Sequence, residues 1–513
     1  SNGDITTGGD VLVSAGTDWT MAGDAVITAA GNVVGEALGG DIGLGVITGE
    51  NIGLTASGSV IDANAGSMNI TATNLSLVAT GGSIGSSDTG NINADANDNA
   101  IDITISALAA SSDSGIYVSE TDGLTVTTVA AVTVDIESVV RVNFNSTTID
   151  VSENQTRSSL EDLSTTTDGP VKLVSLAGSL TIDGGSDSVG VSANGAGDVL
   201  IEARGAGSDV IINADVISGT GNITLDAANN LTVNASLSTG GSGTLYMVAG
   251  NDIGVNDSVI TVSGDILVES GGDITQTASI TSTSGDVGLI AGSTLAQTSN
   301  GDITTGGDVL VSAGTDWTMA GDAVITAAGN VVGEALGGDI GLGVINGVNV
   351  ALSASNSILD SNAGLMNITA TNLSLVATNG LIGGSDTGNG NADANANAID
   401  ITVSTLAASS DSGIYVSETD GLIVTTVAAV TVDIESVVRV NFNSTTTDVS
   451  EDLTVSSLED LSTDTDGPVK LVSLAGSLTI DGGSGGPGVS ANGSGDVLLE
   501  AAQDVITNAD VIS

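Results

Sequence analysis

Aspartates that follow glycine are the most frequent candidates for chemistry in this sequence. If the Gly-Asp pairs stack in register, Asp265, Asp286 and Asp308 lie along one edge. Neighbouring carboxylates about 5 Å apart repel by roughly 1 kcal/mol in water, and Ca²⁺ could bridge them. Asn222 and Asn330 stand at equivalent places, where a side-chain oxygen would cap backbone amides at a corner. Capping is therefore the favoured interpretation, with a Ca²⁺ ladder as the alternative and no other cofactor expected.

A glutamate and an arginine that recur together are the second candidate. Glu137 and Arg141 are an even number of residues apart and could share a strand face, as could Glu435 and Arg439. Carboxylates or a basic residue in a groove carry out polysaccharide cleavage in lyases and hydrolases. A surface ion pair explains the residues more simply, and the chain has no histidine. We therefore expect no enzyme and no catalytic residues, and keep a polysaccharide lyase or hydrolase as the weakest alternative.

Two further signals have simpler explanations. Trp19 and Trp317 could stack on sugar rings, but a lone tryptophan more often fills a wide corner of a core. The segment Asp95–Asn99 resembles the calcium linker of cadherins. The corresponding segment Asp393–Asn397 lacks the central acid, so chance is the better explanation.

The charge balance excludes several classes of partner. The chain has 62 acidic and 6 basic residues, for a net charge of −56. Nucleic-acid binding needs the opposite sign, and an anionic membrane surface would repel the chain. The chain has no cysteine, which removes disulfides and thiolate chemistry, and no run of about 18 apolar residues that would insert into a membrane. The acidity is typical of a soluble, long and exposed object.

The elements that would position these residues belong to a long repeat. The sequence of Ser1–Thr298 begins again at Ser299, an offset of 299 − 1 = 298 residues, and the second copy runs to Ser513. A period of this length predicts an array. We therefore expect one β-solenoid copy over 1–298 and a second, truncated by the end of the chain, over 299–513. We also expect no flexible linker between them, and a chain that is a window from a longer polypeptide.

A shorter rhythm lies inside each copy. Glycines that open strands recur about every 21 residues, at Gly221, Gly243, Gly264, Gly285, Gly307 and Gly329. Short aliphatic runs such as Ile223–Leu225 and Ile266–Val268 follow them, and no helical spacing competes. About 21 residues with two or three short strands make one coil of a parallel β-helix, in which strands pair with the next coil about 4.8 Å away. The chain would then form about 24 coils and a rod on the order of 115 Å long.

The stretch Ile101–Gly185 is poorer in glycine than the rest. Val132–Val134 and Val139–Val142 are predicted as separate short strands of a continuous β-helix with longer corners. Ser158–Ser164 lacks the alternation of a strand, and a short helix is expected near Leu160.

The recurring Gly-Asp strands, together with Ala228–Val233 and Ala249–Ile253, resemble the repeat regions of filamentous-haemagglutinin-type exoproteins and other giant β-strand-repeat surface proteins of bacteria. The resemblance implies a right-handed parallel β-helix, export to the cell surface, and a role as a stalk, surface filament or fibre. Partners would be further copies of the same repeat or chain, stacked end to end or laterally. An adhesin module that binds glycans or a protein of a host or partner cell is the alternative. The family has no catalytic residues to carry over.

Overall fold

The computed structural model describes residues 3–87, 99–385 and 396–513, and within these ranges the chain contains strands and turns but no helix. Accordingly, the described ranges hold no helix of the length and apolarity needed to cross a lipid bilayer. The chain divides into two compact units. Unit 1 comprises Ser1–Val248 with Val438–Asp448, and unit 2 comprises Ala249–Val437 with Val449–Ser513. The unit boundary differs from Ser299, where the sequence repeat begins again.

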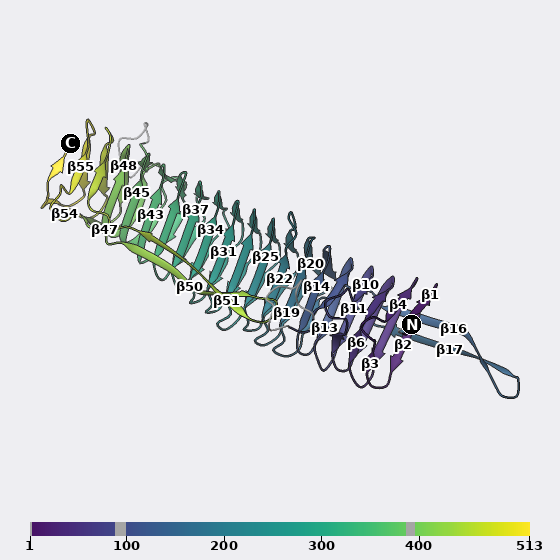
Figure 1. Ribbon diagram of the computed structural model, residues 1–513. Coiled ribbons are helices and arrows are strands. Elements are labelled where there is room, and N and C mark those ends of the chain that lie inside the picture. Colours follow the sequence, from purple (N-terminus) through teal and green to yellow (C-terminus); the bar gives the residue numbers. More distant parts are fainter. Residues whose placement is uncertain (1–2, 88–98, 386–395) are drawn as a thin grey trace. The chain divides into compact units, whose positions relative to one another are not determined.

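The strands that begin before Ala249 are drawn in purple to teal in Figure 1. They are β1 (Ile5–Thr7), β2 (Val11–Ala15), β3 (Trp19–Thr20), β4 (Val26–Ala29), β5 (Val33–Ala37), β6 (Ile42–Leu44), β7 (Val46–Thr48), β8 (Asn51–Ala56), β9 (Val60–Asp62), β10 (Ile70–Thr71), β11 (Asn74–Ala79), β12 (Ile101–Thr104), β13 (Ala107–Ser112), β14 (Ile116–Glu120), β15 (Leu124–Thr127), β16 (Val132–Val142), β17 (Thr148–Arg157), β18 (Leu163–Thr165), β19 (Val171–Ser175), β20 (Leu180–Gly184), β21 (Val189–Ala193), β22 (Val199–Ala203), β23 (Val210–Ile212), β24 (Asp215–Ser218), β25 (Ile223–Ala227), β26 (Leu231–Val233), β27 (Leu237–Thr239) and β28 (Leu245–Ala249).

The later strands are drawn in teal to yellow. They are β29 (Ile253–Val255), β30 (Val259–Thr261), β31 (Ile266–Ser270), β32 (Ile274–Gln276), β33 (Ile280–Ser282), β34 (Val287–Ala291), β35 (Leu295–Gln297), β36 (Ile303–Thr305), β37 (Val309–Ala313), β38 (Trp317–Met319), β39 (Val324–Ala327), β40 (Val331–Ala335), β41 (Ile340–Leu342), β42 (Val344–Asn346), β43 (Asn349–Ala354), β44 (Ile358–Asp360), β45 (Ile368–Ala377), β46 (Leu381–Ile382), β47 (Ile399–Ser410), β48 (Gly413–Glu418), β49 (Leu422–Thr425), β50 (Val430–Val440), β51 (Thr446–Val455), β52 (Leu461–Thr463), β53 (Val469–Ser473), β54 (Leu478–Gly482), β55 (Val489–Ala491), β56 (Val497–Ala501), β57 (Val505–Thr507) and β58 (Val511–Ile512).

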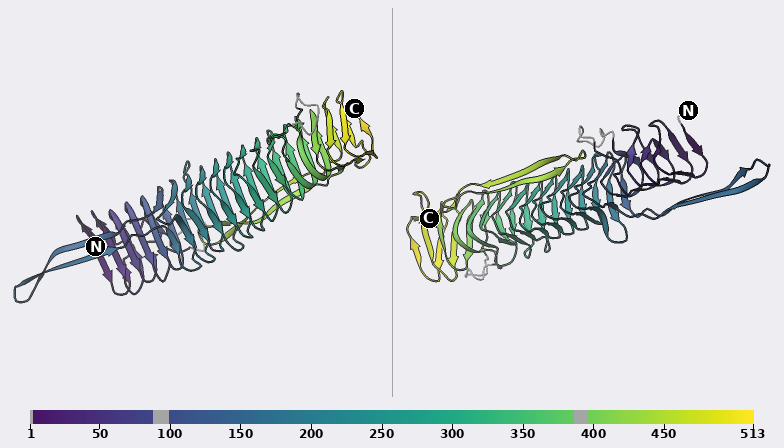
Figure 2. Two further views of the ribbon diagram at one scale, coloured as in Figure 1. Left: turned by 180° about the vertical axis from the view of Figure 1, so that it is seen from behind. Right: turned by 90° about the horizontal axis from the view of Figure 1, so that it is seen from below.

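Most of these strands pair in parallel with the third strand after them. In unit 2, β31 pairs with β34, β32 with β35 and β33 with β36. In unit 1, β19 pairs with β22 and β20 with β23 in the same way. We call each group of three successive strands a rung, and Figure 2 shows the strands of each unit side by side from two further directions. The prediction of an all-β chain with parallel strand pairing is confirmed.

The register between rungs puts like residues on top of one another. Ile266 pairs with Val287, and Val287 pairs in turn with Val309. All three side chains are fully buried, so each rung covers the aliphatic surface of the one before it. Steric crowding explains why a glycine precedes such a strand, because a side chain at this position would clash with the previous rung. A Cβ added at Gly285 would lie 2.5 Å from the carbonyl oxygen of Gly264 one rung earlier.

One region departs from this pattern and corrects the sequence-based prediction. Val132–Val134 and Val139–Val142 are not strands of separate coils, since both belong to β16, which pairs antiparallel with β17. The hairpin leaves the rungs and extends past β1 in Figures 1 and 2. The helix expected near Leu160 is also wrong, because Leu160 forms an antiparallel bridge with Val129 that closes the base of the hairpin.

Apolar packing and a hydrogen bond are among the contacts that hold the base of this hairpin against the rungs of unit 1. Val132 and Val134 are buried against Val34, and the Asn32 amide donates a hydrogen bond of 3.0 Å to the carbonyl oxygen of Thr133. Asn32 is itself the first member of an asparagine ladder, because its Oδ1 accepts a 2.8 Å bond from the Asn51 amide of the next rung. The far part of the hairpin, beyond Ile136, lies outside these contacts.

Candidate functional site

The Gly-Asp aspartates connect one rung to the next. Oδ1 of Asp265 accepts a 2.8 Å hydrogen bond from the backbone N–H of Asp286, and Oδ1 of Asp286 accepts one of 2.6 Å from the N–H of Asp308. Asp308 accepts in the same way from Asn330 at 2.7 Å. Burial raises the pKa of Asp265 and of Asp286. The capping interpretation is thus confirmed for these three aspartates, while the Ca²⁺ ladder stays a prediction.

The same cap occurs in both sequence copies. Asp10 accepts from the N–H of Asn32 at 2.8 Å, and this pair corresponds to Asp308 and Asn330 in the second copy. A carboxylate bound to a backbone N–H is one of the stronger hydrogen bonds in proteins. The aspartates therefore stabilise the corners between rungs in both copies.

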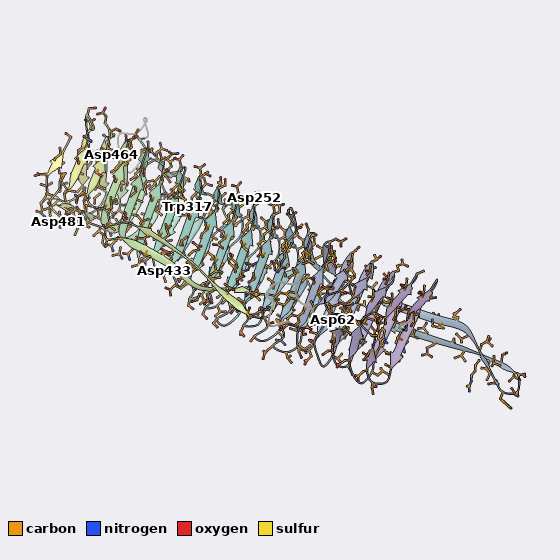
Figure 3. The ribbon with its side chains drawn as sticks, viewed as in Figure 1. Asp62, Asp252, Trp317, Asp433, Asp464 and Asp481 are labelled. Carbon is orange, nitrogen blue, oxygen red and sulfur yellow. The ribbon has the colours of Figure 1, made fainter. Side chains whose placement is uncertain are left out.

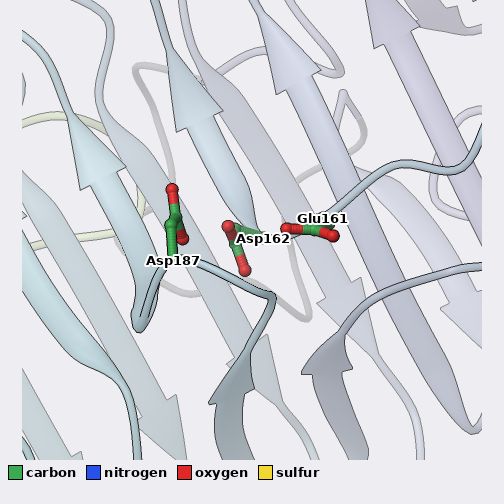
Figure 4. A group of neighbouring side chains, drawn as sticks. All are labelled: Glu161, Asp162 and Asp187. Carbon is green, nitrogen blue, oxygen red and sulfur yellow. The ribbon is translucent and has the colours of Figure 1, made fainter.

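A second acidic group gathers three carboxylates that the sequence did not suggest. Glu161, Asp162 and Asp187 each have an oxygen within 4.8 Å of the others (Figure 4). Glu161 and Asp162 lie between the Val129–Leu160 bridge and β18, and Asp187 lies in the turn between β20 and β21. Asp162 has a φ of +64°, which turns the chain just before β18. Asp187 comes one rung later in the chain, and this step brings it beside Asp162.

The three carboxylates of this group lie close enough for their negative charges to repel one another. Glu161 is held by Ser186, whose N–H and hydroxyl donate to its Oε2 at 2.8 and 2.9 Å. The side chain of Asp162 is buried, and its Oδ1 has no hydrogen-bond partner. Burial first, and then the charges of Asp187 and Glu161, raise the pKa of Asp162 to about 6. Adjacent carboxylate oxygens with one unsatisfied atom are ligands that a hard cation such as Ca²⁺ prefers, with water completing its shell.

The second copy lacks one of the three acids. Glu459 and Asp460 correspond to Glu161 and Asp162, but Gly485 stands where the first copy has Asp187. The Ser484 N–H donates to Glu459 at 3.3 Å, so the surrounding loop is similar. Burial and the charge of Glu459 raise the pKa of Asp460. Among the described residues, the first copy thus has a group of three carboxylates where the second copy has a matched group of two.

Two fully buried glutamates were also missed by sequence reasoning. Glu120 accepts from the backbone N–H groups of Ile105 and Asp122 at 3.2 and 3.1 Å. Glu418 accepts from Val403 and Asp420 at the same distances. Burial raises the pKa of each glutamate to about 8, so both carry a proton at neutral pH. Their hydrogen bonds to backbone amides indicate a structural role.

The structure gives Arg439 partners other than the glutamate on its own strand. Its Nη2 lies 2.6 Å from Asp226 and 3.7 Å from Glu202, all within unit 1. Sequence spacing could not find these partners, because they lie in the other copy of the repeat. Glu137 and Arg141 of the first copy are both exposed on β16.

The tryptophan of the second copy is part of the core. Trp317, labelled in Figure 3, is fully buried. Its indole N–H donates a 3.0 Å hydrogen bond to Gln297, which is also buried. The Gln297 amide donates in turn to Gln276 of the preceding rung at 3.1 Å. The interpretation of Trp317 as a residue that fills the core is confirmed, and Trp19 is half-buried. Asp95–Asp98 and Asp393–Asn395, in the cadherin-like segments, lie outside the described residues.

Comparison of the chain with models of known protein families, with curated proteins and with solved structures found no match.

Proposed function

We propose that the parallel strands wind as a right-handed β-solenoid with three strands and about 21 residues per coil. The pairing of each strand with the third one after it supports this winding, because three steps along the chain return the backbone to the same ladder. The spacing of the paired residues Ile266, Val287 and Val309 supports the coil size. The right hand follows the resemblance to filamentous-haemagglutinin-type repeats.

The solenoid serves as a structural segment of a giant secreted protein and forms an extracellular stalk, surface filament or fibre. One observation carries this proposal: the bonds between rungs recur in both copies of the long repeat, as at Asp10–Asn32 and Asp308–Asn330. Each rung bonds to its neighbours, so adding copies adds length. A protein whose role is to be long needs the same contact between every pair of neighbouring rungs. The hydrogen bond from a backbone N–H to the aspartate of a Gly-Asp corner is such a contact.

The composition supports a structural role over a catalytic one. The chain has no histidine and no cysteine, the side chains that most often serve as general base or nucleophile. Its net charge of −56 keeps a long surface hydrated and discourages lateral aggregation. Both properties suit a bacterial surface spacer.

Negative-stain electron microscopy of two chains tests the proposal. One chain is the present protein, and the other carries an additional copy of residues 1–298 at its start. We expect straight rods whose lengths differ by about 60 Å, since the added copy supplies about 12 to 14 coils of about 4.8 Å each. Globular particles, or a second chain that is wider without being longer, would contradict the proposal.

A further inference from the structure

The outer face of the rungs in unit 2 carries a row of apolar residues. Ile266 and Val268 of β31 point into the core, so Leu267 between them points to the opposite face of the strand. We name the outer row by the residues that continue from it in register, one per rung: Leu267, Gly288, Leu310, Val332 and Ala351. Apart from the glycine, these residues are at most 1% exposed. Another element of the chain therefore covers the outer row.

The covering element is the hairpin of the second copy. β50 and β51 form a two-stranded sheet of their own, and they run across the rungs of unit 2 in Figures 1 and 2. Val432 and Ile434 of β50 are fully buried. A Cβ added at Gly288 would lie 3.2 Å from Cγ1 of Ile434, so the hairpin crosses the outer row at this glycine. We name residues 430–437 and 449–455, which belong to unit 2, the strap.

The tip of the same hairpin, residues 438–448, belongs to unit 1 and is held there by two kinds of contact. Phe442 is fully buried and meets the ring of Tyr117 edge to face, with ring centroids 6.2 Å apart and an interplanar angle of 79°. Arg439 forms ion pairs with Asp226 and Glu202. Residues 437–446 are identical to residues 139–148 of the first hairpin. The tip thus combines aromatic packing with opposite charges.

The strap, in contrast, places acids against acids. Glu451 of β51 and Glu269 of β31 are both half-buried, and their side chains share a hydrogen bond. Two carboxyl groups can share a hydrogen bond only when one of them carries a proton. Burial first, then the charge of Glu269 and this hydrogen bond, and last the charge of Asp452, raise the pKa of Glu451. Glu435 of β50 adds its negative charge to the surroundings of Asp286.

Positive charge that would balance these acids is missing from this part of the chain. Unit 2 contains one basic residue, Lys470, which lies on β53. In the first copy, Arg157 of the hairpin donates to Glu36 of the rung. In the second copy, Glu334 corresponds to Glu36, but Val455 stands at the place of Arg157. Apolar contact therefore holds the strap in place against repulsion between like charges.

We propose that the strap is a reversible cover over the outer row, closed when Glu451 and Glu269 share a proton and lifted when both carboxylates are charged. Closure buries aliphatic side chains of the strap and of the rungs, and this burial favours the closed state at every pH. Loss of the shared proton adds repulsion in a half-buried site, where charges interact more strongly than in water. Lifting leaves the rungs paired and exposes an apolar row, which is a property of interaction surfaces. The movement is separate from the proposed role as a stalk or fibre.

The direction of the pH effect follows from the raised pKa of Glu451. The closed strap binds a proton that the lifted strap releases, so acid favours closure. This stabilisation is complete below pH 4.5, the ordinary value of the group, and it is lost as the pH rises through the raised pKa. Salt screens the repulsion between the charged forms and therefore favours closure at high pH.

Native-state hydrogen exchange, corrected for the intrinsic exchange rate at each pH, measures the lifting of the strap. We expect the protection of residues 430–437 and 449–455 to fall about 10-fold between pH 5 and pH 8. Residues 287–291 of β34, which lie beneath the strap, should stay protected, because their hydrogen bonds to neighbouring rungs persist. This comparison separates lifting from unfolding of unit 2. Salt at about 1 M, where the Debye length is about 3 Å, should recover part of the protection at pH 8.

Two variants of the strap are matched, because each removes one negative charge. Glu451→Gln keeps a donor for Glu269 and removes the repulsion, so protection at pH 8 should stay within about 2-fold of its value at pH 5. Asp433, labelled in Figure 3, is exposed between Val432 and Ile434, which face the rungs. Its side chain therefore points away from the rungs, and Asp433→Asn should keep the full fall in protection.

A neutral apolar dye gives a second measurement. Binding of Nile red should increase from pH 5 to pH 8 in the parent chain and in Asp433→Asn, and it should stay constant in Glu451→Gln. Three results would overturn the proposal: equal protection of the strap at pH 5 and pH 8, loss of protection in the strap and β34 together, or the same response in both variants.

Discussion

The two sequence copies attach the bases of their hairpins by different chemistry. In the first copy, Arg157 of β17 forms an ion pair of 2.5 Å with Glu36 of β5, and Gly53 of β8 lies directly beneath its side chain. A Cβ at Gly53 would come within 2.9 Å of Cγ of Arg157. In the second copy, Val455 stands at the place of Arg157 and Ala351 at the place of Gly53, and both are buried.

The difference teaches that two positions far apart in sequence changed together. The step from Gly53 to Ala351 adds a methyl group to the strand, and the step from Arg157 to Val455 removes a long side chain above it. The first copy has a charge pair, in which a hydrogen bond from Ser14 and then Arg157 hold the pKa of Glu36 below its usual value. The second copy has aliphatic burial, which can stabilise as well as a buried ion pair.

The largest expected effect on stability distinguishes two hairpin tips: the buried tip of the second copy, which contains Phe442, and the exposed tip of the first copy, which contains Phe144. Phe442→Ala should lower the free energy of opening of residues 438–448 by about 3 kcal/mol, because it leaves a cavity in a closed aromatic cluster. Phe144→Ala should change stability in dilute protein by less than about 0.5 kcal/mol, because the ring is exposed. Native-state hydrogen exchange measured by mass spectrometry compares the two. Equal effects at both positions would show that the tips do not differ.

The next largest expected effect on stability concerns Gly53 and Arg157, which are in contact at the base of the first hairpin. Gly53→Ala should destabilise by about 1 to 3 kcal/mol, because the new methyl overlaps Arg157. Adding Arg157→Val to Gly53→Ala recreates the residues of the second copy and should recover most of that loss. Urea denaturation of the two single variants and the double variant forms a double-mutant cycle. Additive effects would mean that the two positions are independent.

The pH dependence should be the same in both copies. The pKa of Glu120 and of Glu418 rises from 4.5 to about 8 on folding, so the folded chain binds protons that the unfolded chain has released. Their stabilisation is complete below pH 4.5 and is lost as the pH rises toward 8. We expect a lower melting temperature at pH 8 than at pH 5, and an equal flattening of this fall by Glu120→Gln and by Glu418→Gln. A melting temperature that rises over this range would contradict the assignment.

The smallest effect concerns Ca²⁺. We expect the carboxylates of Glu161, Asp162 and Asp187 to bind one Ca²⁺ per chain, with a rise of a few degrees in melting temperature as binding stabilises the folded state. The second copy, with Gly485, supplies the built-in comparison. Asp187→Gly makes the first site equivalent to the second and should abolish binding in isothermal titration calorimetry.

The reverse substitution in the second copy, Gly485→Asp, is a poor control. Gly485 has a φ of +115°, where an aspartate would be strained. The rival location is the ladder of Asp265, Asp286 and Asp308. If Asp187→Gly leaves Ca²⁺ binding unchanged and Asp286→Asn removes it, the ladder holds the ion. If neither variant changes the heat of titration, both sites are wrong.

The rungs could be predicted from sequence because their signals are local. The run Ile266–Val268 lies within β31, and Ile223–Leu225 lies within β25. Each is an aliphatic strand after a glycine, and the regular step between such glycines places its partner. The capping role of the Gly-Asp aspartates followed from the same register. These predictions needed no knowledge of distant contacts.

The hairpin was missed although part of its signal is present. Residues 124–168 contain no glycine, in contrast to the regular glycines of the rungs. The tip has a short loop, Phe144–Ser146, closed by a 2.8 Å bond from the Asn143 N–H to the Thr147 carbonyl oxygen. Ser146 has a φ of +61°, as such loops require. Long alternation on both sides of an Asn-rich turn was the available sign of a hairpin.

The remaining features depend on contacts that no local pattern encodes. Asp187 reaches Asp162 across one rung through a turn of unpredicted length. Arg439 of the second copy meets Asp226 of the first. Identical tips can be exposed or buried, so even a perfect reading of the hairpin sequence could not assign its surroundings.

The claim that neighbouring rungs pair in register has a direct test, because the chain has no native cysteine. Thr275 pairs with Ala296 of the next rung, so a Thr275→Cys/Ala296→Cys variant places two thiols about 4.8 Å apart at the backbone, within the range of a disulfide. We expect this pair to oxidise readily and Thr275→Cys/Thr298→Cys, about 8 Å apart, to stay reduced. Equal oxidation of both pairs, or none in the first, would contradict the account.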